Sequence, residues 1–332
     1  MVGGLKMVSP PPPSPARVRR LQVVANGGGF PAFLPKEVEK IRDPFARALA
    51  QRIVRIPVPL QMEKFNGCVM SSCIKPLGQQ HCANPVVLLH CFDSSCLEWR
   101  CTYPLLDQAC LETWALDVLG WGFSELQVLP PCDAASKRHH LFQLWKTYIK
   151  RPMILVGPSL GATIAVDFAA TYPEAVQKLV LINANAYSEG TGQLAKLPKL
   201  VAYAGVRLLK SFPLRLLANV LAFRSVPLPK QIDWTNVGRL HCRMSWWEMA
   251  TVDYMISGGY NVASQIKLVK QKTLVICSEN DQIVNNQLSV KLLCELRNSV
   301  FREVPGSGHL PHVENPEHVA ELIADFARED LR

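Results

Sequence analysis

MILVGPSLGATIAVDFAA, residues 153–170, predicts a buried strand that turns into a helix within one Gly-x-Ser-x-Gly step. Its first part is a short apolar run, which is typical of a strand buried on both faces. Gly157 and Gly161 flank Ser159, and small residues are needed where strand and helix backbones approach closely. Ser159 therefore belongs either to a tight structural turn or to a nucleophile elbow. Its chemical partners elsewhere in the chain decide between the two.

Apolar runs of the same kind recur along the chain, and helical segments separate most of them. They occupy residues 52–60, 67–75, 85–91, 113–120, 179–185, 272–278 and 300–305. Helical spacing is expected from Asp43 and Pro44 to Ile53, over 135–149 and over 316–326. This alternation predicts an α/β fold with a mostly parallel, doubly wound sheet.

One interval breaks the alternation. Residues 186–265 contain many aromatic residues and no convincing strand, which predicts an inserted helical cap between core segments 37–185 and 266–332. Within it, residues 190–232 have no Asp or Glu and carry seven cations, Lys196, Lys199, Arg207, Lys210, Arg215, Arg224 and Lys230. Apolar residues mixed only with cations favour contact with an anionic membrane surface through 196–230. An ordinary cap with a solvated basic face is the alternative.

A nucleophilic serine needs a base and an acid that orients the base, here expected in the chain order Ser, acid, His. Asp281 follows the predicted strand 272–278, and His309 follows the predicted strand 300–305 within a Gly-Ser-Gly-His loop. Both positions lie at the carboxyl edge of the sheet, where open α/β sheets place their sites. His312 competes as the base, but the flanking glycines favour His309. Ser159, Asp281 and His309 are thus the predicted catalytic residues.

An oxyanion hole needs two backbone N–H donors. The residue after the nucleophile, Leu160, supplies one, and Phe92 in the loop after strand 85–91 is the natural second donor. Cys91, Trp246, Trp247 and Tyr254 are candidates for the substrate pocket, although an aromatic cluster is also typical of plain core. Structural roles are expected for His90, Asp93, Asp117 and Asp167.

The stretches VLLHCFDSS, DVLGWGFSE, VGPSLGA, ENDQIV and GHLPHVENP together resemble the α/β-hydrolase fold family over residues 55–332, except the cap. The resemblance implies that Ser159 is the nucleophile, His309 the base and Asp281 the orienting acid. It also implies that the Phe92 and Leu160 amides bind the oxyanion, with no metal or organic cofactor. Cys91 departs from the family pattern, in which this loop begins His-Gly.

More narrowly, HCFDSSCLEWRCTYPLL, SEGTG, GRLHC and SGGYNVAS resemble a group of plant chloroplast hydrolases. The group includes an envelope enzyme implicated in releasing prenyl alcohols, such as phytol, for tocopherol synthesis. The resemblance implies a serine esterase that acts on hydrophobic prenyl or acyl esters. Two alternatives remain open: an acyltransferase that uses the same triad, and a ligand receptor with slow or absent turnover, which the Cys91 departure allows.

The chain has 332 residues and a formal net charge of +9. Residues 1–36 lack acids, are rich in Arg and Pro and have no apolar signal region, so they resemble a chloroplast transit peptide. A disordered tail is the alternative. The eleven cysteines include no CxxC pair and are interpreted as reduced, small apolar residues. Nucleic-acid binding is not expected, because the charge lies on a lipophilic cap.

Overall fold

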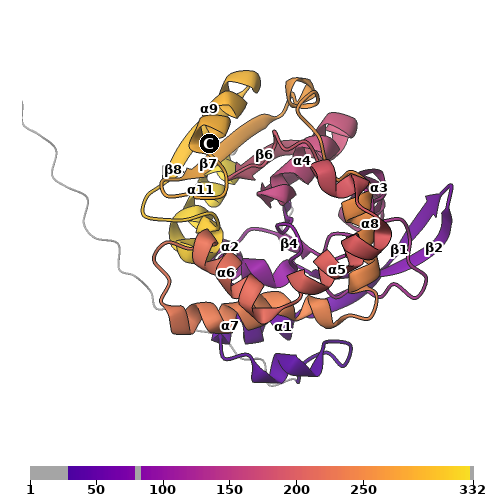
Figure 1. Ribbon diagram of the computed structural model, residues 1–332. Helices are drawn as coiled ribbons and strands as arrows, with labels where there is room; N and C mark the ends of the chain where they lie inside the picture. The colour runs from indigo at the N-terminus through magenta and orange to yellow at the C-terminus, as the bar shows by residue number, and fades with distance from the viewer. Residues whose placement is uncertain (1–28, 79–83, 330–332) are drawn as a thin grey trace, which may run out of the picture.

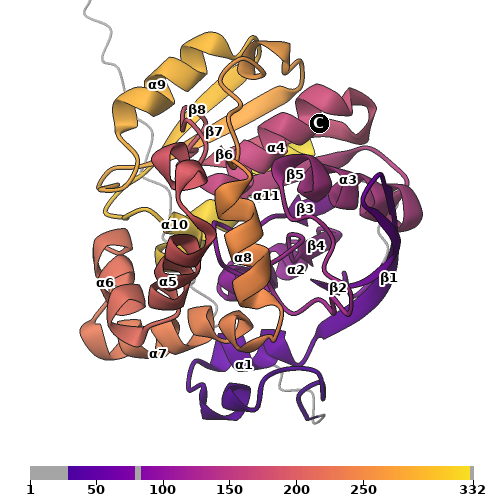
Figure 2. The same cartoon turned by 45° about the vertical axis from the view of Figure 1, so that its right-hand side comes forward.

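An eight-stranded sheet organises the chain in the computed structural model, which describes residues 29–78 and 84–329 (Figures 1 and 2). The strand order is β1-β2-β4-β3-β5-β6-β7-β8. β2 runs antiparallel to its neighbours β1 and β4, and all other strand pairs are parallel. The strands are β1 (Ile53–Met62), β2 (Phe65–Ile74), β3 (Val86–Leu88), β4 (Thr113–Leu116), β5 (Met153–Pro158), β6 (Val176–Ile182), β7 (Lys272–Ser278) and β8 (Ser299–Val304).

Each face of the sheet carries its own apolar core, because neighbouring residues of a strand point to opposite faces. In β5, Met153 and Leu155 enter one core, whereas Ile154 and Val156 enter the other. The first core is covered by α3 (Ala134–Leu144), α4 (Leu160–Thr171) and α9 (Asn286–Glu295). The second is covered by α1 (Pro44–Ala50), α2 (Tyr103–Gln108) and α11 (Pro316–Arg328). The predicted doubly wound α/β architecture is confirmed.

Helices alone make up the cap between residues 186 and 265, and they lie together on one side of the sheet (Figures 1 and 2). α5 packs against α8, and α6 packs against α7. The elements are η5 (Gly192–Lys196), α5 (Lys199–Leu209), α6 (Phe212–Ala222), α7 (Leu228–Arg239), η6 (His241–Arg243) and α8 (Trp247–Ile256).

The packed part of the chain begins before residue 37, earlier than the boundary expected from the sequence. Leu34 is buried in the second core, and Phe33 lies under the Arg55 guanidinium at 4.2 Å. Of the predicted transit segment, residues 1–36, residues 1–28 lie outside the described part of the chain. None of the helices in residues 29–78 and 84–329 combines the length and apolarity that a membrane crossing requires.

Candidate active site

Ser159 is the single residue between β5 and α4, and it has an unusual backbone conformation, φ 49° and ψ −114°. The two flanking glycines make this turn sterically possible. A Cβ on Gly157 would lie 2.2 Å from the carbonyl carbon of Gly161, and a Cβ on Gly161 would lie 2.8 Å from the His90 carbonyl oxygen. The Ser159 amide donates to the Ile182 carbonyl at the end of β6 (2.9 Å). The turn therefore holds a partly exposed serine at the carboxyl edge of the sheet.

Asp281 and His309 meet at the same edge. The Nδ1 of His309 donates to Oδ2 of Asp281 at 2.8 Å, and both side chains are almost completely buried. The other carboxylate oxygen, Oδ1, accepts the amides of Ile283 (2.8 Å) and Val284 (3.0 Å). The carboxylate is thus fixed by its own loop and leaves Nε2 of His309 available to act as a base.

His312, the competing base in the sequence, points elsewhere. Its Nε2 donates to Glu98 at 3.0 Å, and its ring is buried. Burial opposes the charge of Glu98, but the hydrogen bond and charge of His312 hold the pKa of this carboxyl at about 2. Both oxygens of Glu98 also accept the Cys91 amide, at 3.1 and 3.2 Å. This buried pair joins the loop after β3 to the helix α10 (Pro311–Glu314).

Asn183 was not singled out by sequence reasoning, yet it holds the loop of His309. It follows β6 with a φ of 43°, and its Nδ2 donates to the His309 carbonyl at 2.9 Å. Its Oδ1 accepts the amide of Ser278 at the end of β7 (2.9 Å). The only signal in the sequence was an asparagine at the carboxyl end of a predicted strand, where asparagine tolerates positive φ.

The two predicted oxyanion donors lie at the ends of neighbouring elements. Leu160 is the first residue of α4, where helix geometry leaves the N–H without an intrahelical acceptor. Phe92 follows β3 in the neighbouring loop, and within the described residues its amide has no hydrogen-bond acceptor. Both amides are therefore free to bind an anion, which is what an oxyanion hole requires.

Cys91 fits its loop without the conformational freedom of glycine, because its φ is not positive. Its amide is held by Glu98, and its Sγ lies 3.6 Å from the Pro158 carbonyl oxygen. Burial raises the pKa of the Cys91 thiol well above its ordinary value, and the charges of Glu98 and Asp281 add to this effect. Cys91 is therefore a neutral side chain packed beside the elbow.

The predicted pocket aromatics have different surroundings. Tyr254 packs near the Phe92 ring (6.0 Å between centroids) and against Trp121 (5.0 Å), so it lies in the aromatic cluster beside the candidate oxyanion loop. The Nε1 of Trp246 donates to the Ser124 carbonyl at 3.1 Å. Trp247 is fully buried, and its Nε1 donates to Asp93 at 2.7 Å.

The aspartates that were expected to be structural have structural partners. Asp117 accepts the amides of Cys96 (2.6 Å) and Phe123 (2.8 Å), and burial raises the pKa of its carboxyl. Asp167 forms an ion pair with Arg138 at 2.8 Å. His90 is fully buried and accepts the Val118 amide on Nε2 at 3.0 Å, which fixes its proton on Nδ1. These groups hold the loops around the site in place.

A serine on a strained strand–helix turn, a buried His–Asp pair and two free amides define the site of a hydrolase on an α/β sheet. The chain belongs to the α/β-hydrolase fold family, whose model matches residues 84–316.

Among its relatives, the chain is 79% identical to the "Alpha/beta hydrolase domain-containing protein VTE7" of Arabidopsis thaliana, over 98% of each chain. It is 26% identical to the "Uncharacterized hydrolase YugF" of Bacillus subtilis, over 75% of this chain and 93% of that protein. A thermophilic esterase from Thermogutta terrifontis has a similar fold. Its TM-score is 0.69 at 18% identity, with 83% of this chain and 98% of the esterase covered.

Proposed function

We propose that the chain is a serine hydrolase that cleaves hydrophobic carboxylic esters through an acyl-enzyme. The observation that carries the proposal is the arrangement at the carboxyl edge of the sheet: Ser159 at positive φ, and His309 bonded to Asp281 at 2.8 Å. Structural turns do not need a buried His–Asp pair beside them. Functional sites are where strained backbone and paired titratable groups gather.

In this mechanism, Oγ of Ser159 attacks the ester carbonyl while Nε2 of His309 takes its proton. The Asp281 carboxylate holds the imidazole with its other proton on Nδ1. The Phe92 and Leu160 amides stabilise the oxyanion of the tetrahedral intermediate. His309 then returns the proton to the leaving alcohol, and a water molecule, activated in the same way, releases the acid from Ser159.

The substrate we propose is an ester of a prenyl alcohol such as phytol, or of a long acyl chain, in the chloroplast. Release of the alcohol would then supply tocopherol synthesis. Support comes from the resemblance of several motifs to plant chloroplast hydrolases and from the high identity to a relative in Arabidopsis thaliana. The aromatic cluster of Phe92, Trp121 and Tyr254 offers apolar surface next to the site.

Covalent labelling by a fluorophosphonate probe tests the nucleophile. We expect the full-length protein to be labelled and the Ser159→Ala variant to remain unlabelled. Asp281→Asn should react about 10⁴ times more slowly, because its histidine loses the correct tautomer. Absence of labelling in a well-folded wild type would contradict the proposal and favour the ligand-receptor alternative.

Product analysis then separates hydrolysis from acyl transfer. Incubation with a phytyl ester should yield phytol and free acid in equal amounts. Adding a free alcohol should not change the amount of acid that is released. Transfer of the acyl group to an added long-chain alcohol in preference to water would instead support an acyltransferase. Failure to cleave phytyl esters alongside rapid cleavage of other lipid esters would retain the serine hydrolase and reject the prenyl substrate.

A further inference from the structure

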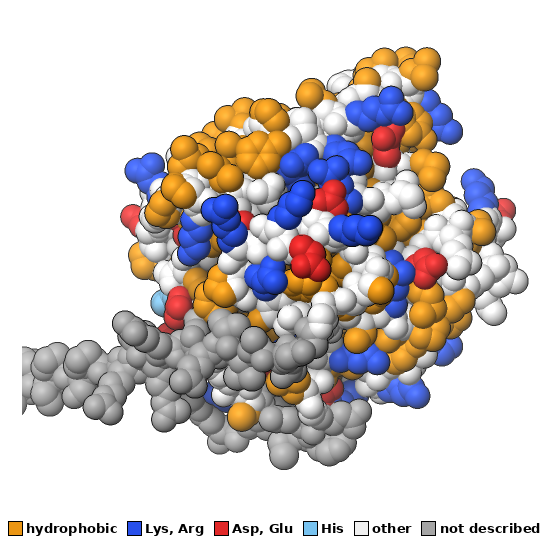
Figure 3. All heavy atoms as spheres, turned by 90° about the horizontal axis from the view of Figure 1, so that it is seen from below, with side chains coloured by type: hydrophobic (Ala, Val, Ile, Leu, Met, Phe, Trp, Pro, Cys, Tyr) orange, Lys and Arg blue, Asp and Glu red, His pale blue; other side chains and the backbone are white. Residues whose placement is uncertain are grey.

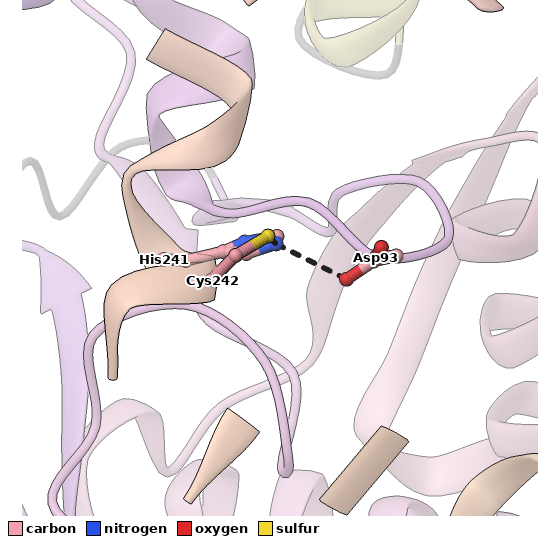
Figure 4. A group of neighbouring side chains, drawn as sticks. All are labelled: Asp93, His241 and Cys242. Atoms are coloured by element: carbon pink, nitrogen blue, oxygen red, sulfur yellow. Dashed lines mark hydrogen bonds and ion pairs between the residues drawn. The ribbon is translucent and has the colours of Figure 1, made fainter. Parts of the chain in front are cut away.

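One buried carboxylate of the loop after β3, that of Asp93, is bound by three separate elements of the cap. The Nε1 of Trp247 in α8 donates to Oδ1 at 2.7 Å, and the Nε2 of His241 in η6 approaches the same oxygen at 3.2 Å (Figure 4). Arg215 in α6 pairs with Oδ2, and its Nη1 also donates to the Asp93 carbonyl at 3.4 Å. Asp93 is the residue directly after Phe92, and its φ is 50°.

Metal binding is the obvious alternative for this cluster, because ligand atoms of Asp93, His241 and Cys242 lie within 4.8 Å of one another. The hydrogen bonds oppose that interpretation. The carboxylate already accepts an indole N–H, an imidazole N–H and a guanidinium, whose positive charge would repel a metal cation. Burial and the nearby Arg215 charge lower the pKa of His241 well below its ordinary value, so the ring is neutral and its proton lies on Nε2. The cluster is a junction between the cap and the loop.

The other end of α6 contacts the second half of the candidate site. The His309 amide donates to the carbonyl of Ala222, the last residue of α6, at 2.6 Å. Gly308 makes this approach possible, since a Cβ there would lie 2.3 Å from the same carbonyl oxygen. A cleft nearby is lined by residues of α6 and α7, of the segment that follows β3, and of the segment that follows His309. A single cap helix therefore binds both the loop of Phe92 and the loop of His309.

We infer that α6 sets the relative positions of the oxyanion donor and the base, and that Arg215 and Asp93 are positioning residues for the reaction. The inference rests on the proposed function, in which the Phe92 amide binds the oxyanion. Hydrogen-bond donors stabilise a transition state only when they are held in place beforehand, and misplacement by about 1 Å can reduce the rate about 10²-fold. In this role, Arg215 and Asp93 act through the backbone of Phe92.

The test compares Arg215→Met, Asp93→Asn and Trp247→Phe with Arg243→Met as a matched control. Arg243 also lies in η6, but its side chain is 42% exposed and pairs with Glu37 at 3.4 Å. Two rates are measured on full-length protein: covalent labelling by the fluorophosphonate probe, and hydrolysis of a short soluble ester that carries no long acyl or prenyl chain. Circular dichroism and the thermal midpoint report the folded fraction of each variant.

For Arg215→Met and Asp93→Asn, we expect the labelling rate and kcat to fall about 10–100-fold while KM changes less than about threefold. Trp247→Phe keeps an aromatic ring but removes the Nε1 donor and part of the buried ring volume. A smaller loss in the same direction is expected, and Arg243→Met should match wild type. If a single variant does not fold, the double variant Asp93→Asn/Arg215→Met removes both buried charges and should show the same kcat loss.

Unchanged labelling and kcat in folded Arg215→Met, Asp93→Asn, Trp247→Phe or double-variant protein would overturn the inference. A loss confined to KM would also overturn it, because the cap would then only bind substrate. An unlabelled wild type is a separate result, which contradicts the serine hydrolase itself.

Discussion

The backbone of Ser159 is strained, and hydrogen bonds on both sides hold it in this conformation. Its φ of 49° costs a non-glycine residue about 1–3 kcal/mol, and such strain persists only where the surroundings over-determine the backbone. Its amide donates to Ile182, and its carbonyl accepts the amides of Thr163 (3.3 Å) and Asn185 (3.4 Å). The Gly-x-Ser-x-Gly pattern made this conformation predictable, because few other patterns permit it.

Asp281 and His309 were predicted together, because each follows a strand of one parallel sheet. Two other residues of the site, Asn183 and Arg215, could not be predicted from the local sequence. Asn183 and Arg215 act through contacts with segments more than 100 residues away in the chain, to His309 and Asp93 respectively. Arg215 was counted among seven cap cations, and nothing in the local sequence distinguishes it from the exposed ones. Its burial depends on where α6 crosses the loop after β3.

The buried His140 in α3 should make the stability of the folded protein depend on pH. Burial, together with the charges of Lys137 and His139, lowers its pKa from 6.5 to about 3, and its Nε2 has no partner among the described residues. Below pH 6.5 the unfolded chain takes up a proton that the folded chain refuses until about pH 3. The contribution of His140 to stability should therefore fall between these values, by at most about 1.4 kcal/mol per pH unit.

Urea unfolding at pH 7.5 and pH 5 measures this effect. His140→Leu should lose clearly less stability than wild type on acidification, because it has no proton to gain in the unfolded state. His139→Leu, which changes a partly exposed neighbour on the same helix, should keep most of the acid sensitivity. Equal losses in all three proteins would show that His140 does not govern this pH range.

At the scale of elements, the packing of α4 against β5 and against the segment after β3 depends on Gly161. A Cβ there would lie 2.8 Å from the His90 carbonyl oxygen and 3.1 Å from Cδ of Pro158, and the first of these is backbone that cannot rotate away. We expect Gly161→Ala to lower the free energy of unfolding by about 1–3 kcal/mol and to slow probe labelling, because the displaced backbone leads into the loop of Phe92.

Gly205→Ala is the matched comparison for stability. Gly205 lies in α5, and a Cβ there would meet nothing within 4 Å. Alanine should therefore raise the free energy of unfolding by about 0.5–1 kcal/mol, through helix propensity alone. Chemical denaturation measures the free energy of unfolding of the two variants and of wild type. A Gly161→Ala variant as stable as wild type would contradict the packing argument.

Most elements were predictable, since apolar strands and helical spacing are local signals. The π-helical turn η3 (Trp145–Ile149) was not separated from α3, because both have similar side-chain spacing. The strand order was not predicted in detail either. β3 lies between β4 and β5, and β1 and β2 form an antiparallel hairpin at the edge. Such pairings depend on contacts between distant segments.

At the scale of the whole molecule, charge and apolar surface coincide on the cap. Exposed apolar side chains there include Leu194, Leu197, Leu200, Val201, Leu208, Leu217, Val220, Leu221, Leu228 and Ile232. The exposed cations of the basic cap segment 196–230 lie among them, and residues 190–232 contain no acid. From below, apolar side chains are seen next to lysines and arginines, with carboxylates interspersed among them (Figure 3). This mixture supports our proposal that the cap contacts an anionic membrane.

Vesicle binding tests this proposal. We expect the protein to sediment with vesicles that contain phosphatidylglycerol more than with pure phosphatidylcholine, because each Lys or Arg near an anionic surface contributes about 1 kcal/mol. Salt should weaken the binding, since exposed charges are screened within about 8 Å at physiological ionic strength. Leu217→Glu/Leu221→Glu places two acids on the exposed face of α6 and should abolish it.

The matched control is Val128→Glu/Leu268→Glu, which makes the same change at two exposed positions outside the cap, 70% and 59% accessible in wild type. This control should bind vesicles nearly as well as wild type. Equal weakening by both pairs would mean that net charge, and not the cap, governs binding.

Because α6 also carries Arg215 and Ala222 on its inner side, a lipid that binds its outer face would contact the helix that holds both loops of the site. Vesicles should therefore raise the labelling rate of wild type and leave that of Leu217→Glu/Leu221→Glu unchanged.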